Sequence, residues 1–187
     1  MIKHFVLKDL DGQEILQLTG RSPILFSDLG KYKSIKQLLG KEGFVVLLLQ
    51  TVNVASGHFV AITENTQTGK IRYFDSYGFS PLLEIQEYVP FDNKNYPNYL
   101  VRLFRDVDFE YNKIDYQSKH PGVSTCGRWA SIACKLRNLS LLQIRELFKG
   151  NSNAWLQDSD NVACMLTMLP IHNITEYLED IQPIKKH

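Results

Sequence analysis

The sequence predicts a single α+β domain, with a sheet formed mainly by the first half of the chain and helices by the second. Three observations carry this prediction. Apolar, β-branched runs gather between residues 44 and 75, helix-periodic segments follow later, and no Pro/Gly/Ser-rich linker or repeat divides the 187 residues. Strands first and helices later are typical of α+β domains, and a chain of this length can bury a sizeable core. We therefore assign residues 1–187 to one domain.

The strands are expected in the first half. Residues 44–50 (FVVLLLQ) form a continuous apolar run, as in a central strand covered on both faces. Residues 58–63 and 70–75 read as two further strands, separated by a turn cluster at 65–69 (NTQTG). These two strands are expected to form a hairpin.

Helical patterns dominate the second half. Residues 81–89 and 96–107 can be helical, and 109–116 reads as another strand. Residues 126–137 have apolar side chains at helical spacing, which predicts the central helix packed on the sheet. Ser140 can cap a helix that runs to Phe148, and residues 160–169 predict one more.

Composition excludes several classes of protein. The formal net charge is +1, which does not favour nucleic-acid or membrane binding. The longest apolar run, 44–49, is far shorter than the roughly 20 residues that a spanning helix needs. No signal peptide is visible at the start. We expect no membrane association.

The three cysteines, Cys126, Cys134 and Cys164, predict free thiols in a reducing, intracellular compartment. Cys126 and Cys134 are eight residues apart on one predicted helix, about 12 Å along its axis, and cannot pair. No cysteine or histidine pair has zinc-ligand spacing. We expect neither a metal nor a cofactor.

Cys126 is the first candidate for chemistry. It stands where an irregular loop gives way to a helix, so its thiol meets unpaired N–H groups and the positive end of the helix dipole. This environment favours the nucleophilic thiolate. The alternative is a cysteine that is simply buried.

His58 and Asp75 are candidates for a base and its orienting carboxylate. They lie at the start and the end of the two hairpin strands, so they fall at the same end of the sheet. There, a carboxylate can hold one imidazole nitrogen and direct the other at a nucleophile. Taken alone, His58 can equally be a histidine at the edge of the sheet, and Asp75 can be an aspartate that bonds its own backbone in a turn.

Gln117 is a candidate oxyanion donor, because a side-chain amide can aim an N–H at developing charge. The backbone N–H groups that begin the helix at Cys126 are further donors. Aromatic residues nearby can equally line a cleft or fill the core: Phe59, Tyr77, Phe79 and Trp129.

Taken together, these segments resemble the adenovirus-type (adenain-like) cysteine proteases, a clan that includes the ubiquitin-like-protein-specific proteases. The resemblance rests on residues 57–61 (GHFVA), 73–78 (YFDSYG), Gln117 and 125–129 (TCGRW), in the clan's order His, acid, Gln, Cys. The interval from Gln117 to Cys126 is longer than usual in the family. Among its members, the short chain looks most like maturation proteases of virophages and Maverick-type viruses.

The resemblance implies a papain-like fold of the adenain type, with a central mixed sheet packed on the helix that carries the nucleophile. It implies a thiol endopeptidase with Cys126 as nucleophile, His58 as base, Asp75 as orienting carboxylate and Gln117 in the oxyanion hole. Such enzymes trim capsid and other virion precursors, often after glycine in Gly-Gly or Gly-X sites. The expected locations are the virion and the host-cell cytoplasm, and the expected state is a monomer.

Three other functions stay open. A deubiquitinase or desumoylase would use the same four residues on a folded modifier. An acetyltransferase of related fold would use the same order of His, acid and Cys. An inert virion or scaffold protein would keep the fold without the chemistry. An activating peptide or DNA is also open, although no cysteine lies between Asp75 and Cys126 to bind a peptide by a disulfide.

Overall fold

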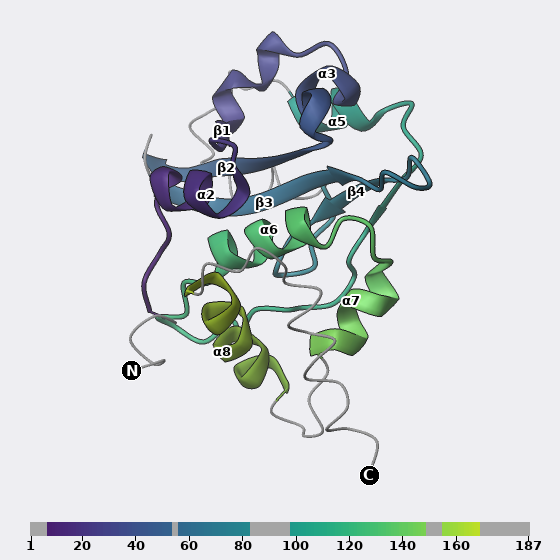
Figure 1. Ribbon diagram of the computed structural model, residues 1–187. Helices are drawn as coiled ribbons and strands as arrows, with labels where there is room; N and C mark the ends of the chain where they lie inside the picture. Colours follow the sequence, from purple (N-terminus) through teal and green to yellow (C-terminus); the bar gives the residue numbers. More distant parts are fainter. Residues whose placement is uncertain (1–6, 54–55, 83–97, 149–154, 169–187) are drawn as a thin grey trace.

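The computed structural model, which describes residues 7–53, 56–82, 98–148 and 155–168, has an α+β architecture built on a mixed five-stranded sheet (Figure 1). The strands follow the order β1-β2-β3-β4-β5 across the sheet. Their bounds are β1 Ile24–Leu25, β2 Phe44–Asn53, β3 Ser56–Glu64, β4 Ile71–Phe74 and β5 Phe109–Tyr111.

The centre of the sheet is antiparallel, and its two edges are parallel. β2 pairs with β3, and β3 pairs with β4, in antiparallel register, whereas β1 joins β2 and β5 joins β4 in parallel. The predicted hairpin of β3 and β4 is therefore confirmed. The predicted strand at 109–116 is shorter than expected, because only 109–111 pair with β4.

Helices cover both faces of the sheet (Figure 1). α3 and α5 lie with the 3-10 helix η1 on one face, and α2, α6, α7 and α8 belong to the other. The bounds are α2 Gly12–Thr19, η1 Phe26–Lys31, α3 Ile35–Leu39, η2 Gly40–Glu42, α5 Tyr99–Phe104, α6 Cys126–Lys135, α7 Leu141–Phe148 and α8 Trp155–Met168.

Alternation along β2 divides the core in two. Val46 and Leu48 face the cluster that contains α6, while Val45, Leu47 and Leu49 face the cluster of α3 and α5. Side chains of a strand alternate between faces, so an all-apolar strand must be covered on both. α6 packs on β3, and every residue from 126 to 134 is buried. The prediction that this helix is the central one is confirmed.

The order of elements corrects one expectation. Helices α2 and α3 precede the main strands, so strands and helices are not simply grouped into two halves. The sequence does contain start and stop signals for α2. Asp11 and Glu14 form a capping box, and Gly20 ends the helix in the left-handed region at φ 79°. Ser34 likewise caps α3 through Gln37 N–H.

The later helices agree with the patterns in the sequence. α5 and α6 lie within the predicted segments, and Ser140 caps α7 as expected, with its Oγ accepting from Gln143 N–H at 3.2 Å. α8 begins five residues earlier than predicted. Of the segment predicted as helix at 81–89, residues 81 and 82 are in a turn and the rest lie outside the described residues, as do 96, 97 and 169.

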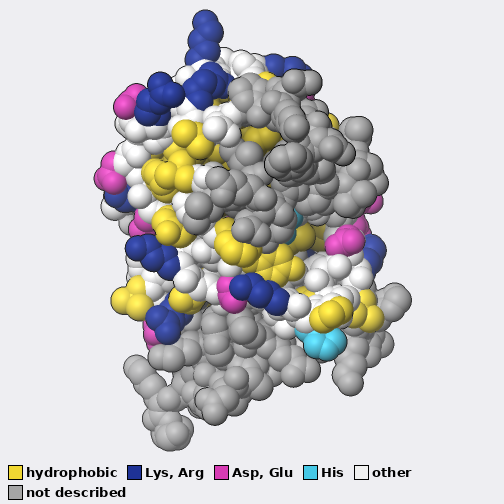
Figure 2. All heavy atoms as spheres, turned by 180° about the vertical axis from the view of Figure 1, so that it is seen from behind, with side chains coloured by type: hydrophobic (Ala, Val, Ile, Leu, Met, Phe, Trp, Pro, Cys, Tyr) yellow, Lys and Arg dark blue, Asp and Glu magenta, His cyan; other side chains and the backbone are white. Residues whose placement is uncertain are grey.

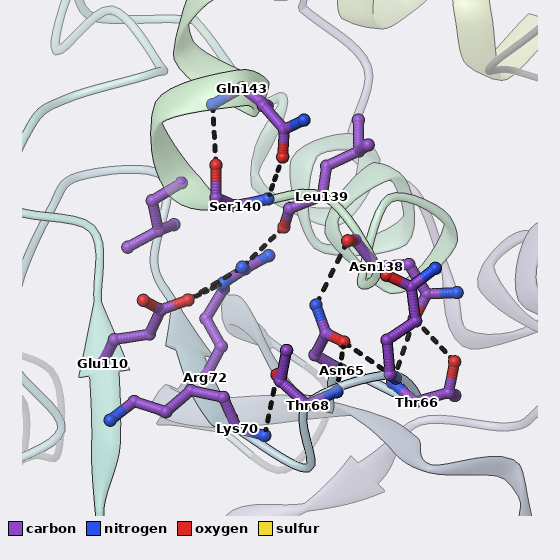
Figure 3. Close-up of polar contacts among 12 residues, drawn as sticks. Asn65, Thr66, Thr68, Lys70, Arg72, Glu110, Asn138, Leu139, Ser140 and Gln143 are labelled. Atoms are coloured by element: carbon purple, nitrogen blue, oxygen red, sulfur yellow. Dashed lines mark hydrogen bonds and ion pairs between the residues drawn. The ribbon is translucent and has the colours of Figure 1, made fainter.

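The hairpin of β3 and β4 is tied to the far end of α6 by side-chain bonds (Figure 3). Asn138, just past α6, accepts from Thr66 N–H at 3.0 Å, and Asn65 Nδ2 donates to the Asn138 carbonyl at 3.1 Å. Nearby, Arg72 of β4 donates to the Leu139 carbonyl at 2.6 Å. These bonds hold the helix alongside the hairpin.

Among the residues described, no helix is both long and apolar enough to cross a membrane. On the face shown in Figure 2, basic and acidic side chains are interspersed among apolar and neutral ones, in keeping with the net charge of +1.

Candidate active site

His58 and Asp75 meet where the hairpin strands begin and end. Ala61 of β3 pairs with Phe74 of β4, so Asp75 follows the last paired residue of β4 and His58 lies near the start of β3. The His58 Nε2 atom lies 2.5 Å from Asp75 Oδ1, with His58 5% exposed and Asp75 fully buried. The predicted juxtaposition of these residues is present.

Asp75 is fixed by its own neighbours. Its two carboxylate oxygens accept from Tyr77 N–H at 3.0 Å and Phe79 N–H at 3.1 Å. Asn112 accepts from the Asp75 backbone N–H at 3.0 Å. Gly78 permits this turn, because its φ of 74° is left-handed and a Cβ there would lie 3.0 Å from the Ile114 backbone. These bonds therefore orient the carboxylate independently of the imidazole.

The environment makes His58 a strong base. Burial by itself lowers the pKa of the imidazole, but hydrogen bonds with Asp75 and Cys126 and the negative charge at both raise the pKa to about 10. Because Asp75 engages Nε2, the nitrogen left for Cys126 is Nδ1. Below pH 10, His58 is thus an imidazolium between the Asp75 carboxylate and the Cys126 sulfur.

Cys126 begins α6, as the sequence predicts, and is 9% exposed. Its helix is held against the N-terminal part of the chain through Gly127, where a Cβ would lie 3.2 Å from Leu10 and 3.3 Å from Phe59. Neighbouring side chains of the protein therefore fill the space that a side chain at position 127 would need.

Burial determines the protonation of the other two thiols. All three cysteines are free, but burial raises the pKa of Cys134 to about 12 and that of Cys164 to about 11. Both stay protonated at neutral pH and are poor nucleophiles. The prediction of free thiols is confirmed.

Gln117 is brought to the same region by a bend that follows β5. It is 1% exposed, and its Oε1 accepts from Ser76 Oγ at 2.9 Å, next to Asp75. Its Nε2 donates to the Tyr77 hydroxyl at 3.0 Å and to the Val123 carbonyl at 3.1 Å. Both amide N–H groups are therefore engaged by the chain, and a substrate oxygen would have to replace one acceptor.

The four aromatic candidates divide between core and site. Phe59 and Trp129 belong to the core cluster around α6. Tyr77 is half-buried and stacks on His58, with ring centroids 5.0 Å apart and planes inclined by 18°, and Phe79 packs edge-on against Tyr77. Tyr77 covers one face of the imidazole and limits its rotation.

Asp160 is a residue of this region that the sequence analysis missed. It lies inside α8, is 2% exposed, and accepts from Thr125 Oγ1 at 2.5 Å, from Ser118 N–H at 2.8 Å and from Trp129 Nε1 at 3.0 Å. Burial raises its pKa, and these bonds oppose the rise. The sequence places Asp160 first in the predicted helix 160–169, where an acidic residue is an ordinary helix-start signal, so nothing in the pattern marked it as buried.

The site thus combines a sulfur at a helix start, an imidazolium in contact with it, and a carboxylate that holds the imidazole. Nucleophile, base and orienting group in hydrogen-bond reach of one another are the requirements for covalent catalysis by a thiol. The sequence predicted all three members of this arrangement, and the structure brings them together.

No protein-family model matches the chain. The chain is similar to the uncharacterized protein V9 of Sputnik virophage, with 25% identity over 176 residues, covering 89% of this chain and 98% of V9. This likeness links the chain to a virophage protein over nearly its whole length, in line with the viral relatives expected from the sequence.

Proposed function

We propose that the protein is a cysteine endopeptidase of the adenain type, with a papain-like fold, and that Cys126, His58 and Asp75 carry its reaction. The single observation behind this proposal is the buried imidazole that touches both Asp75, at 2.5 Å, and Cys126 at the start of α6. A merely structural cysteine does not require an oriented imidazolium beside it.

The reaction begins when Cys126 Sγ attacks the scissile carbonyl carbon. A sulfur–carbon bond forms, and the carbonyl electron pair moves to oxygen. As this oxyanion collapses, the carbon–nitrogen bond breaks and His58 gives its proton to the leaving amine. Water then attacks the thioester, His58 takes the water proton, and the Cys126 sulfur leaves as the peptide acid is released.

The oxyanion needs donors that are already in place. The first N–H groups of α6 point towards the helix start, as in any helix, and lie beside the nucleophile. Gln117 can add a side-chain N–H after exchange with Tyr77 or Val123. We assign the backbone groups as the primary donors and Gln117 as the second donor.

The proposed substrates are capsid and other virion precursors, cut after glycine in Gly-Gly or Gly-X sites. The similarity to a virophage protein supports a viral context. The net charge of +1 gives no support to DNA as an activator. The virion and the cytoplasmic virus factory are the proposed places of action.

The test measures cleavage of a peptide with Gly-Gly before a fluorogenic amide. Cys126→Ala and His58→Ala should each abolish turnover, whereas Cys164→Ala, at a buried and protonated thiol, should keep it. Iodoacetamide at neutral pH should label Cys126 before Cys134 and Cys164. Turnover retained by Cys126→Ala or His58→Ala would rule the mechanism out.

A substrate panel separates the rival enzymes. Peptide and virion-precursor substrates report an endopeptidase, a fluorogenic ubiquitin or SUMO ester reports a deubiquitinase or desumoylase, and thioester formation from acetyl-CoA reports an acetyltransferase. An unreactive Cys126 would favour an inert protein with the same fold.

A further inference from the structure

Asp160 closes the long segment that separates Gln117 from Cys126. Its Oδ2 accepts from Ser118 N–H at 2.8 Å, directly after Gln117, and its Oδ1 accepts from Thr125 Oγ1 at 2.5 Å, directly before Cys126. One buried carboxylate therefore holds both ends of residues 118–125. The donors that contact this carboxylate in the described residues are neutral, and the third of them is Trp129 Nε1.

The bond to Thr125 changes how α6 begins. A threonine at the N-cap ordinarily has extended backbone angles and accepts from an N–H group in the first turn. Thr125 makes no such side-chain bond, and its φ of −106° and ψ of 4° fall in the bridge region between helix and strand. Its hydroxyl group is instead directed at α8, where it donates to Asp160.

The consequence falls on the first N–H groups of α6. These groups have no acceptor within their own helix, and the capping oxygen that ordinarily takes one of them is turned towards α8. A helix start without its side-chain cap is less stable than a capped one but keeps its donors beside Cys126.

We propose that Asp160 is a positioning residue for acyl transfer at Cys126. By holding the Thr125 hydroxyl, its carboxylate keeps the first N–H groups of α6 clear of their ordinary cap and open to the oxyanion. This inference rests on the proposed peptidase function. In this proposal Asp160 acts through the Thr125 hydroxyl that it holds, and not by contact with the reacting atoms.

The experiment compares wild type with Asp160→Leu, Thr125→Val and the double variant. Leucine keeps the approximate size but accepts no hydrogen bond, which releases the Thr125 hydroxyl to cap α6. Three quantities are measured on each protein: kcat and KM for the Gly-Gly fluorogenic peptide, the inhibition constant of the matching peptide aldehyde, and the rate of Cys126 alkylation by iodoacetamide. Aldehyde addition creates an oxyanion, whereas alkylation does not.

In Asp160→Leu, we expect kcat and aldehyde affinity to fall about 100-fold, as for loss of an oxyanion donor. KM and the alkylation rate should stay within threefold of wild type. Adding Thr125→Val removes the intruding hydroxyl, so the double variant should regain at least tenfold in both kcat and aldehyde affinity. Thr125→Val alone should change kcat and aldehyde affinity no more than Ser131→Ala does. Ser131→Ala is the matched control, because it also removes a buried hydroxyl at α6.

A double variant no better than Asp160→Leu would overturn the inference, as would a parallel loss of alkylation, which would mean a displaced sulfur. If Asp160→Leu does not fold, the same comparison is made with Asp160→Asn, where a smaller loss and the same rescue are expected. If the wild type is active and Asp160→Leu leaves kcat and aldehyde affinity unchanged, only this inference is refuted. A wild type that neither cleaves the peptide nor binds the aldehyde removes the proposed function and this inference with it.

Discussion

Gly57→Ala is the sharpest test of how the sheet positions His58. Gly57 precedes His58 and pairs with Gln50 across β2 and β3. A Cβ at this position would lie 1.9 Å from the Leu49 carbonyl oxygen and 2.7 Å from its carbon, where real contacts stay beyond 3.0 Å. The obstacle is backbone, so β3 must move from β2 by about 1 Å at the residue that carries the imidazole.

A displacement of about 1 Å at a reacting group costs on the order of 100-fold in rate, and overpacking costs about 1–3 kcal/mol in stability. We therefore expect kcat/KM for the Gly-Gly peptide to fall about 100-fold, with a lower midpoint in urea unfolding. Gly12→Ala is the matched control, because its Cβ would lie 3.4 Å from Pro23 in a helix; activity should be unchanged. A Gly57→Ala protein within threefold of wild type would refute the reasoning.

Further predictions concern the neighbours of the imidazole and the bonds of Asn138 at the far end of α6. The raised pKa of His58, about 10 against an ordinary 6.5, stabilises the fold fully below pH 6.5 and progressively less towards pH 10, so urea midpoints should fall over that interval. Asp75→Asn should move this fall, and the alkaline limb of kcat/KM, to lower pH. Tyr77→Phe keeps the stacked ring but frees a Gln117 N–H, so kcat should hold or rise. Gln117→Glu should lower kcat about 100-fold. An equal loss of kcat in both variants would assign the donor role to the tyrosine hydroxyl. Asn138→Ala should cost up to about 1 kcal/mol in unfolding without changing kcat/KM, because its exposed bonds lie at the far end of α6.

The proximity of His58 and Asp75 was predictable because it follows from short-range rules. One turn joins two alternating strands, and antiparallel pairing then places the start of the first beside the end of the second. The position of Cys126 was predictable for a similar reason, since the change from loop to helical periodicity marks a helix start.

Other features depended on contacts between distant segments. The sequence places Gln117 near the end of a strand, but only the fold shows that both of its amide N–H groups are taken by Tyr77 and Val123. Similarly, a glycine at position 127 can leave room for a substrate or for other parts of the protein. The packing of Leu10 and Phe59 against Gly127 shows that other parts of the protein occupy this space.

The sequence by itself determined the α+β class, the hairpin, the helix that begins at Cys126 and the three residues of the proposed reaction, because periodicity, turn chemistry and strand pairing are local. Tertiary structure alone decided the electrostatics of the imidazole and the contacts of Asp160. Burial and long-range hydrogen bonding set both, and neither is a property of neighbouring residues in the chain. The carboxylate that holds Thr125 comes from a separate helix, and only folding brings it to the residue that precedes Cys126.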